Sequence, residues 1–166
     1  METSFMNAHK NRFLIYAIIG LLFGVLDWFY LDWLAHLSWG SLGQSVLVVP
    51  LILLMNYGIW LVPVIPIGIH EARRAARGTT PALASALTWF CAMLGYYGYY
   101  TVLLSLGKLP HLEYLNVFAG KYTTFWLDYW KMFHRVILSQ FLEWGAIALV
   151  AGSALGALLY RLLHKP

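Results

Sequence analysis

Six side chains that could bind a solute lie within or beside apolar stretches of this sequence. They are two carboxylates, an amide, two phenols and an indole: Asp27, Glu143, Asn56, Tyr96, Tyr99 and Trp126. A carboxylate is costly in hydrocarbon, so an acid inside a membrane segment predicts a functional role when it faces other helices or a cavity. Carboxylate charge and aromatic faces together favour a cation. These residues therefore predict a binding site for a small cationic or aromatic solute.

Asp27 is the centre of this prediction because of its position in the apolar stretch 13–37. Gly20, Gly24 and Asp27 recur at positions i, i+4 and i+7, which lie on one side of a helix. Gly20 and Gly24 form a pair of small residues four apart, a spacing that lets another helix approach closely. The side of this helix that packs is thus expected to carry the acid.

Composition indicates a membrane protein. Hydrophobic residues make up 61% of the chain and charged residues 11%, whereas a soluble domain has about 25% charged residues. The formal net charge is +4, but the basic residues cluster at the ends of apolar runs, which argues against nucleic acid as a partner. The single cysteine, Cys91, excludes an intrachain disulfide. We predict one all-α, polytopic membrane domain over 1–166, in contact with lipid.

Hydropathy predicts four transmembrane helices in this domain. They cover about 13–35, 45–69, 82–106 and 136–160. Lys and Arg are concentrated at both termini and in the connection at 70–80. The positive-inside rule assigns these regions to the cytoplasm. The predicted localisation is the cell (plasma or inner) membrane, with both termini cytoplasmic.

An amphipathic helix is predicted between the third and fourth spans, at about 122–134. Its aromatic residues, Trp126 among them, recur every three or four positions, which is the helical period. The helix is too polar to span the membrane and suits the outer interface. A lid over the mouth of the bundle is an equal alternative, because amphipathicity alone does not distinguish lipid from protein as the apolar partner.

The second span contains features that disturb a helix. Pro63 lacks a backbone donor and would clash with the carbonyl of Ile59. Asn56, Tyr57 and Gly58 lie just before this point. Interrupted helices often line binding sites in transporters. A simple kink, with the freed backbone groups satisfied by neighbouring helices, is the more common arrangement in membranes.

The connection after the second span carries a cytoplasmic charge run, which consists of His70, Glu71, Arg73, Arg74 and Arg77. The topology signal explains this run, and a patch for lipid headgroups or for a docking partner is the alternative. The histidines and acids outside the spans match no standard ligand spacing, so we expect no metal site and no cofactor.

Most of the candidate residues are expected at similar depths in the bilayer. At about 1.5 Å per residue, Asp27 lies about 21 Å from the inner end of its span. Glu143 lies about 10 Å below the outer surface by the same rise. We therefore expect the acids, the amide and the phenols to share the outer half, although Glu143 lies almost opposite Gly145 on its helix.

The predicted function is the binding or transport of this solute, alone or as a subunit of a transport complex. The alternative is a non-catalytic membrane subunit that docks other subunits or lipids, with the acids holding the bundle in register through interhelical hydrogen bonds. An intramembrane enzyme that uses the two acids is the least favoured class, and no residue is assigned a catalytic role.

Overall fold

The computed structural model describes residues 2–38, 49–106 and 125–164. The elements in order are α1 (Glu2–Ser38), α2 (Val49–Gly58), α3 (Leu61–Ala72), α4 (Thr79–Ser105), α5 (Phe125–Met132), the π-helix η3 (Phe133–Leu138) and α6 (Ser139–Leu163). Every regular element within these ranges is a helix. The prediction of an all-α chain is therefore confirmed.

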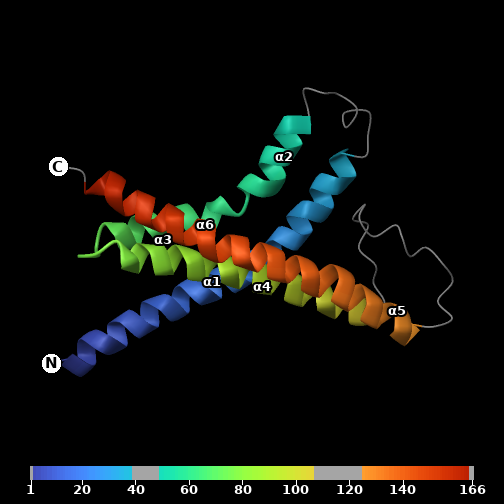
Figure 1. Ribbon diagram of the computed structural model, residues 1–166, viewed down its shortest axis with the longest axis horizontal. Coiled ribbons are helices and arrows are strands. Elements are labelled where there is room, and N and C mark those ends of the chain that lie inside the picture. Colours follow the sequence, from blue (N-terminus) through green and yellow to red (C-terminus); the bar gives the residue numbers. More distant parts are fainter. Residues whose placement is uncertain (1, 39–48, 107–124, 165–166) are drawn as a thin grey trace.

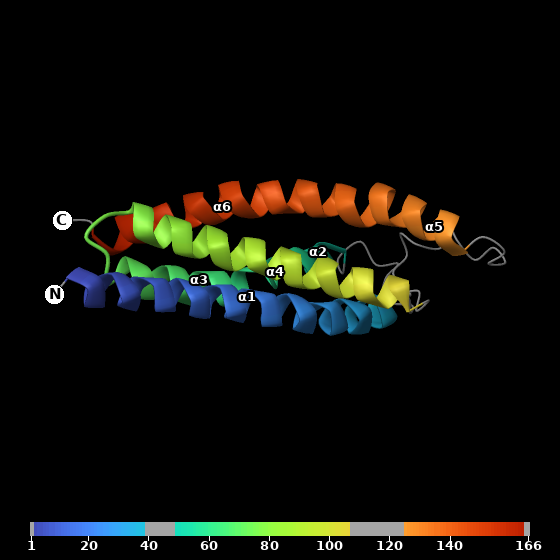
Figure 2. The same cartoon turned by 90° about the horizontal axis from the view of Figure 1, so that it is seen from below.

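Helix α4 is the centre of the arrangement. It packs against α1, α3 and α6, and Figure 2 shows it between α1 and α6. In Figure 1, α2 leans away from α4 and α6 towards the far half of α1. The N-terminus, the C-terminus and the connection between α3 and α4 lie at the same end of the molecule (Figures 1 and 2).

Glycine allows α1 and α4 to touch backbone to backbone. A Cβ atom at Gly20 would overlap the carbonyl oxygen of Thr88, and one at Gly24 would overlap the carbonyl oxygen of Ala92. The contact is reciprocal, because a Cβ at Gly95 of α4 would overlap the carbonyl oxygen of Leu21. The small-residue packing side predicted for the first helix is confirmed, and the close approach explains why only glycine fits there.

Helices α4 and α6 meet in the same way nearer the end where the termini lie. A Cβ atom at Gly152 would come within 2.8 Å of the Cα atom of Ala86. One at Gly156 would overlap the carbonyl oxygen of Pro81. Two small-residue contacts thus join α4 to a helix on each side and fix its position in the bundle.

Two helices in the described ranges are long and apolar enough to cross a membrane. They are Asn11–Leu31 in α1, with 21 residues, and Tyr129–Leu163, with 35 residues, which runs through α5, η3 and α6. The second predicted span consists of α2 and α3, whose 10 and 12 residues are each too short for a crossing. Helix α4 has 27 residues, which is long enough for a crossing, but it is less apolar than these two helices.

The predicted disturbance at Pro63 is a full interruption. Helix α2 ends at Gly58 and α3 begins at Leu61. Pro63 has no N–H to donate to Ile59, so the carbonyl oxygen of Ile59 accepts a 3.0 Å hydrogen bond from Val62 N–H instead. The simple kink is therefore not what the chain adopts, since the freed carbonyl is satisfied by a tight turn.

The helix predicted at 122–134 is present from Phe125, but it is not separate from the fourth span. Helix α5 continues through η3 into α6, as Figures 1 and 2 show. Residues five apart point in different directions on an α-helix but come together in a π-helix, whose hydrogen bonds join residues five apart. Met132 and Ile137 are accordingly both buried, at 3% and 2% exposure. The spacing of the apolar residues changes at this point, which suggests a helix boundary in the sequence. The π-helix accommodates that change within one continuous helix.

Candidate functional site

Asp27 is almost fully enclosed. Its side chain is 1% exposed, and neither carboxylate oxygen has a hydrogen-bond partner in the described part of the chain. It follows Gly24 by one helical turn on the side of α1 that packs against α4, as the sequence predicts. A buried carboxylate without a partner is costly, and such groups in native structures call for a specific explanation.

Aromatic rings gather around this part of α1 and form what we call the aromatic cluster. Its members are Phe23, Trp28, Trp60, Tyr96, Tyr99 and Tyr100. Trp28 is central, with ring centroids 4.9 Å from Tyr100 and 5.3 Å from Tyr96. The Tyr100 hydroxyl is buried and, like Asp27, has no hydrogen-bond partner among the described residues.

Contacts above and below Asp27 show which element it faces. Phe23, Asp27 and Tyr30 occupy positions i, i+4 and i+7 of α1, so they share one side of the helix. The Phe23 ring lies 6.4 Å from the ring of Trp60, and the Tyr30 hydroxyl donates a 3.4 Å hydrogen bond to the carbonyl oxygen of Met55. Met55 and Trp60 flank the interruption between α2 and α3. Asp27 therefore lies opposite this interruption.

The structure brings together some of the other predicted residues. Tyr96 is buried and Tyr99 half-buried, and the rings of both contact Trp28. Asn56 is half-buried and follows Met55 directly at the end of α2. The structure thus places Asn56 and the two tyrosines on elements that flank Asp27.

Two predicted residues are not part of this group. Glu143 is exposed on α6, and its carboxylate interacts electrostatically with Tyr97 and not with Asp27. Helix α5 includes Trp126, but its side chain lies outside the described part of the structure. The exposed position of Glu143 agrees with its place almost opposite Gly145, which is buried against Phe90.

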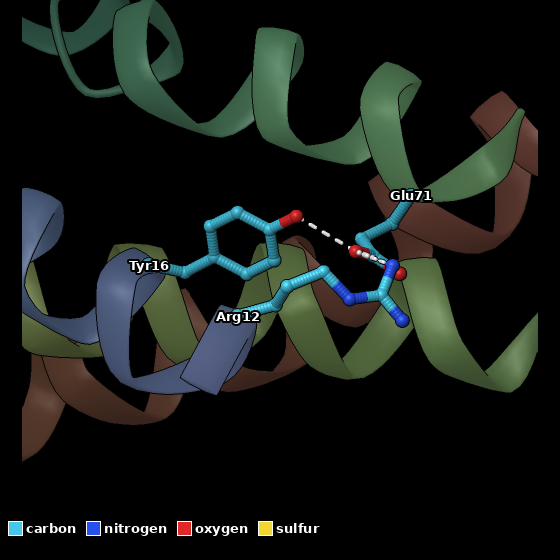
Figure 3. Close-up of polar contacts among 3 residues, drawn as sticks. All are labelled: Arg12, Tyr16 and Glu71. Atoms are coloured by element: carbon cyan, nitrogen blue, oxygen red, sulfur yellow. Dashed lines mark hydrogen bonds and ion pairs between the residues drawn. The ribbon is translucent and has the colours of Figure 1, made fainter. Parts of the chain in front are cut away.

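A second buried carboxylate, Glu71, belongs to the charge run at 70–77, whose burial the sequence did not indicate. Its side chain is 1% exposed. Oε1 of Glu71 accepts a 2.9 Å hydrogen bond from Nη1 of Arg12 and a 2.7 Å hydrogen bond from the hydroxyl of Tyr16 (Figure 3). We call these three residues the inner polar cluster. Arg12 and Tyr16 are four apart on α1, a spacing that puts both donors on one side of the helix.

The two buried carboxylates have opposite environments. Glu71 is neutralised by a guanidinium and hydrogen-bonded by a phenol, so it ties α1 to α3 and leaves little capacity to bind a solute. Asp27 has neither kind of partner within the ranges that the structure describes. Of the two, Asp27 is the one whose charge a ligand would satisfy.

Transition-metal chemistry has no ligand set in this region. Among the described residues, no three or more His, Cys, Asp or Glu side chains are grouped closely enough to hold a metal ion. Comparisons with family models, with curated proteins and with solved structures find no match to this chain. A function for this chain is therefore inferred from the residues around Asp27.

Proposed function

We propose that this protein crosses the membrane four times and binds a small cation at Asp27, as a carrier for that cation or as a subunit of a transport complex. The observation that carries the proposal is the enclosed Asp27 carboxylate, which has no hydrogen-bond partner in the described part of the chain. Its charge is unfavourable in an apolar interior unless a counter-charge is present. A bound cation would supply that counter-charge.

Surface character supports the membrane location. The side of α1 turned away from α4 exposes large apolar residues, including Leu14, Leu22 and Leu26, and α6 likewise exposes Leu142 and Val150. Contiguous apolar surface of this kind is rare on soluble monomers and is normal against lipid.

The arrangement of the helices supports four crossings. Helix α4 lies between the two apolar helices and runs beside them (Figure 2), so a bilayer that contains both of those would also contain α4. Helices α2 and α3 would cross in series, as the two halves of one interrupted span. The end of the molecule with both termini also has exposed Arg73, Arg74 and Arg77, which supports a cytoplasmic location for that end under the positive-inside rule.

Cation binding matches the chemistry around Asp27. A carboxylate supplies negative charge, and aromatic faces attract cations through their quadrupoles. The Asp27 side chain is 1% exposed, and this exclusion of water strengthens its attraction for a cation. The inner polar cluster and the glycine contacts hold the cytoplasmic half of the bundle together. We therefore place the site in the outer half, behind a closed inner half.

The proposal is tested by thermal unfolding of the purified protein in detergent with different chloride salts at constant ionic strength. Na⁺, K⁺, tetramethylammonium and N-methylglucamine are compared for the wild type, Asp27→Asn and Glu143→Gln. We expect at least one cation to stabilise the wild type, by about 2.7 kcal/mol when its concentration is 100 times its dissociation constant. Glu143→Gln is a matched control because Glu143 is an exposed carboxylate in the same protein.

The two variants separate binding from general salt effects. Glu143→Gln should keep the stabilisation and Asp27→Asn should lose it, because Glu143 is exposed whereas Asp27 is enclosed and has no hydrogen-bond partner among the described residues. The proposal fails if no cation in the set stabilises the wild type. It fails equally if Asp27→Asn is stabilised as much as the wild type.

A further inference from the structure

We infer that the cation bound at Asp27 is a dehydrated monovalent metal ion of the size of Na⁺, and that backbone carbonyl oxygens at the C-terminal end of α2 complete its coordination. This inference rests on the proposed function and goes further by naming the ion class and a second set of ligands. Three observations carry it: the interruption of the second span, the side of α1 on which Asp27 lies, and the tight enclosure of Asp27.

The interruption produces a helix C-terminus in the middle of a span. Helix α2 ends at Gly58, and the last four carbonyls of any helix have no partner within that helix. These carbonyls form the negative end of the helix dipole, equivalent to about half an elementary charge. Unwound backbone and half-helix C-termini coordinate Na⁺ in transporters whose spans are interrupted.

One of these terminal carbonyls is in contact with the side of α1 that carries Asp27. Met55 is among the last four residues of α2, and its carbonyl oxygen lies 3.4 Å from the hydroxyl of Tyr30. On the other side of the interruption, Trp60 contacts Phe23. Asp27 lies between Phe23 and Tyr30 on the same side of α1. The unpartnered carboxylate is thus directed at the segment where the carbonyls end.

Enclosure limits the size of the occupant. Asp27 is 1% exposed, so its carboxylate is enclosed on all sides. One turn earlier on α1, a Cβ atom at Gly24 would already overlap the backbone of α4, so the two helices are in direct contact next to Asp27. A quaternary ammonium ion would have to force these packed helices apart, whereas a bare metal ion is small enough to bind beside the carboxylate.

Charge limits the valence of the occupant. One carboxylate and one helix C-terminus together supply about one and a half negative charges, which is suited to a single positive charge. Calcium sites in proteins use six to eight oxygen ligands, including several carboxylates. In the described ranges, Asp27 belongs to no group of three or more His, Cys, Asp or Glu side chains that could hold a metal ion. A monovalent ion therefore fits better than a divalent one.

The experiment uses Na⁺ itself as the probe, with the full-length protein in detergent. The unfolding temperature is measured as NaCl replaces N-methylglucamine chloride, and the concentration for half-maximal stabilisation is compared between variants. Pro63→Ala restores the N–H that could close the helix across the interruption, so it should raise this concentration about tenfold or more. Pro66→Ala, an exposed proline within α3, is the matched control and should leave it unchanged.

Tyr30→Phe provides an independent test if Pro63→Ala does not fold. This change removes the donor to the Met55 carbonyl and frees that oxygen for the ion. The concentration of Na⁺ for half-maximal stabilisation should then fall, by about two- to tenfold. A rise or no change in Tyr30→Phe would overturn the role of the α2 carbonyls, as would equal effects of Pro63→Ala and Pro66→Ala.

The same measurements distinguish this inference from the proposed function. Stabilisation by tetramethylammonium but not by Na⁺, lost in Asp27→Asn, would overturn the inference and leave the proposed function in place. No stabilisation by any cation would overturn both. Saturable stabilisation by Na⁺ that is absent in Asp27→Asn, weakened in Pro63→Ala but not in Pro66→Ala, and strengthened in Tyr30→Phe would support both.

Discussion

The hydroxyl of Tyr16 donates a 2.7 Å hydrogen bond to Oε1 of Glu71, across 55 residues of sequence. The same oxygen accepts a hydrogen bond from Arg12, so one buried acceptor joins two side chains of α1 to the end of α3 (Figure 3). This contact lies at the end of the bundle where the termini lie (Figure 1). This end of the bundle is therefore held by an ion pair as well as by packing.

Loss of Arg12 is expected to destabilise the protein, and neutralisation of Glu71 in the same variant is expected to recover part of that loss. Arg12→Gln leaves a buried carboxylate with one donor and should lower the free energy of unfolding by about 1.5–3 kcal/mol. Adding Glu71→Gln to that variant should restore part of the loss, because it removes the unpaired charge. Chemical unfolding in detergent measures both effects. Arg73→Gln, at an exposed arginine, is the control, and an equal loss there would contradict the role of the ion pair.

The contact between α1 and α4 predicts opposite outcomes at two glycines. Gly24→Ala should destabilise the protein and lower its folded yield, because the new Cβ overlaps the backbone of Ala92. Gly98→Ala, on the exposed side of α4 with open space around it, should be neutral or stabilising by about 0.5–1 kcal/mol. Thermal unfolding measures both. Equal tolerance of the two changes would show that the helices do not approach as closely as described.

The four-span topology predicts which residues are accessible from each side of the membrane. In a background with Cys91→Ala, a cysteine at Arg74 should react with an impermeant reagent only from the cytoplasmic side. A cysteine at Ser105, at the other end of α4, should react only from outside. Both positions are exposed in the structure. Reaction of both from the same side would rule out a complete crossing by α4.

The two buried carboxylates should respond oppositely to substitution in the absence of a bound cation. Asp27→Asn removes an unpartnered charge, so it should raise the free energy of unfolding in N-methylglucamine chloride. Glu71→Ala removes the acceptor shared by Arg12 and Tyr16 and should lower it, by about 1–3 kcal/mol. A destabilising Asp27→Asn in this medium would favour a structural role for Asp27.

Local periodicity was sufficient to predict much of this fold. The spacing of Gly20, Gly24 and Asp27 places the acid on the packing side of α1, because a helix has a fixed period. The same period separates Glu143 from Gly145 on α6, and Glu143 is accordingly exposed. These relationships lie within one helix, so the sequence alone defines them.

Relationships between distant segments were not predictable in the same way. The partners of Glu71 are more than fifty residues away, so its burial cannot be inferred from the arginines beside it. Pro63 predicts a disturbance of the second span, but the contact of Tyr30 with the end of α2 joins residues 25 apart and is not visible in the local pattern. The continuity of α5 and α6 depends on a π-helix that lets Met132 and Ile137 share one side. These features depend on how the helices pack against one another, which local periodicity does not reveal.

The most direct test of cation binding at Asp27 is its reaction with dicyclohexylcarbodiimide, an apolar reagent that adds to buried carboxylic acids. Mass spectrometry locates the adduct and measures its rate of formation with NaCl or with N-methylglucamine chloride, and exposed Glu143 is the internal reference. We predict that Na⁺ slows the reaction at Asp27 and leaves the rate at Glu143 unchanged. An Asp27 adduct that forms at the same rate in both salts would contradict the account.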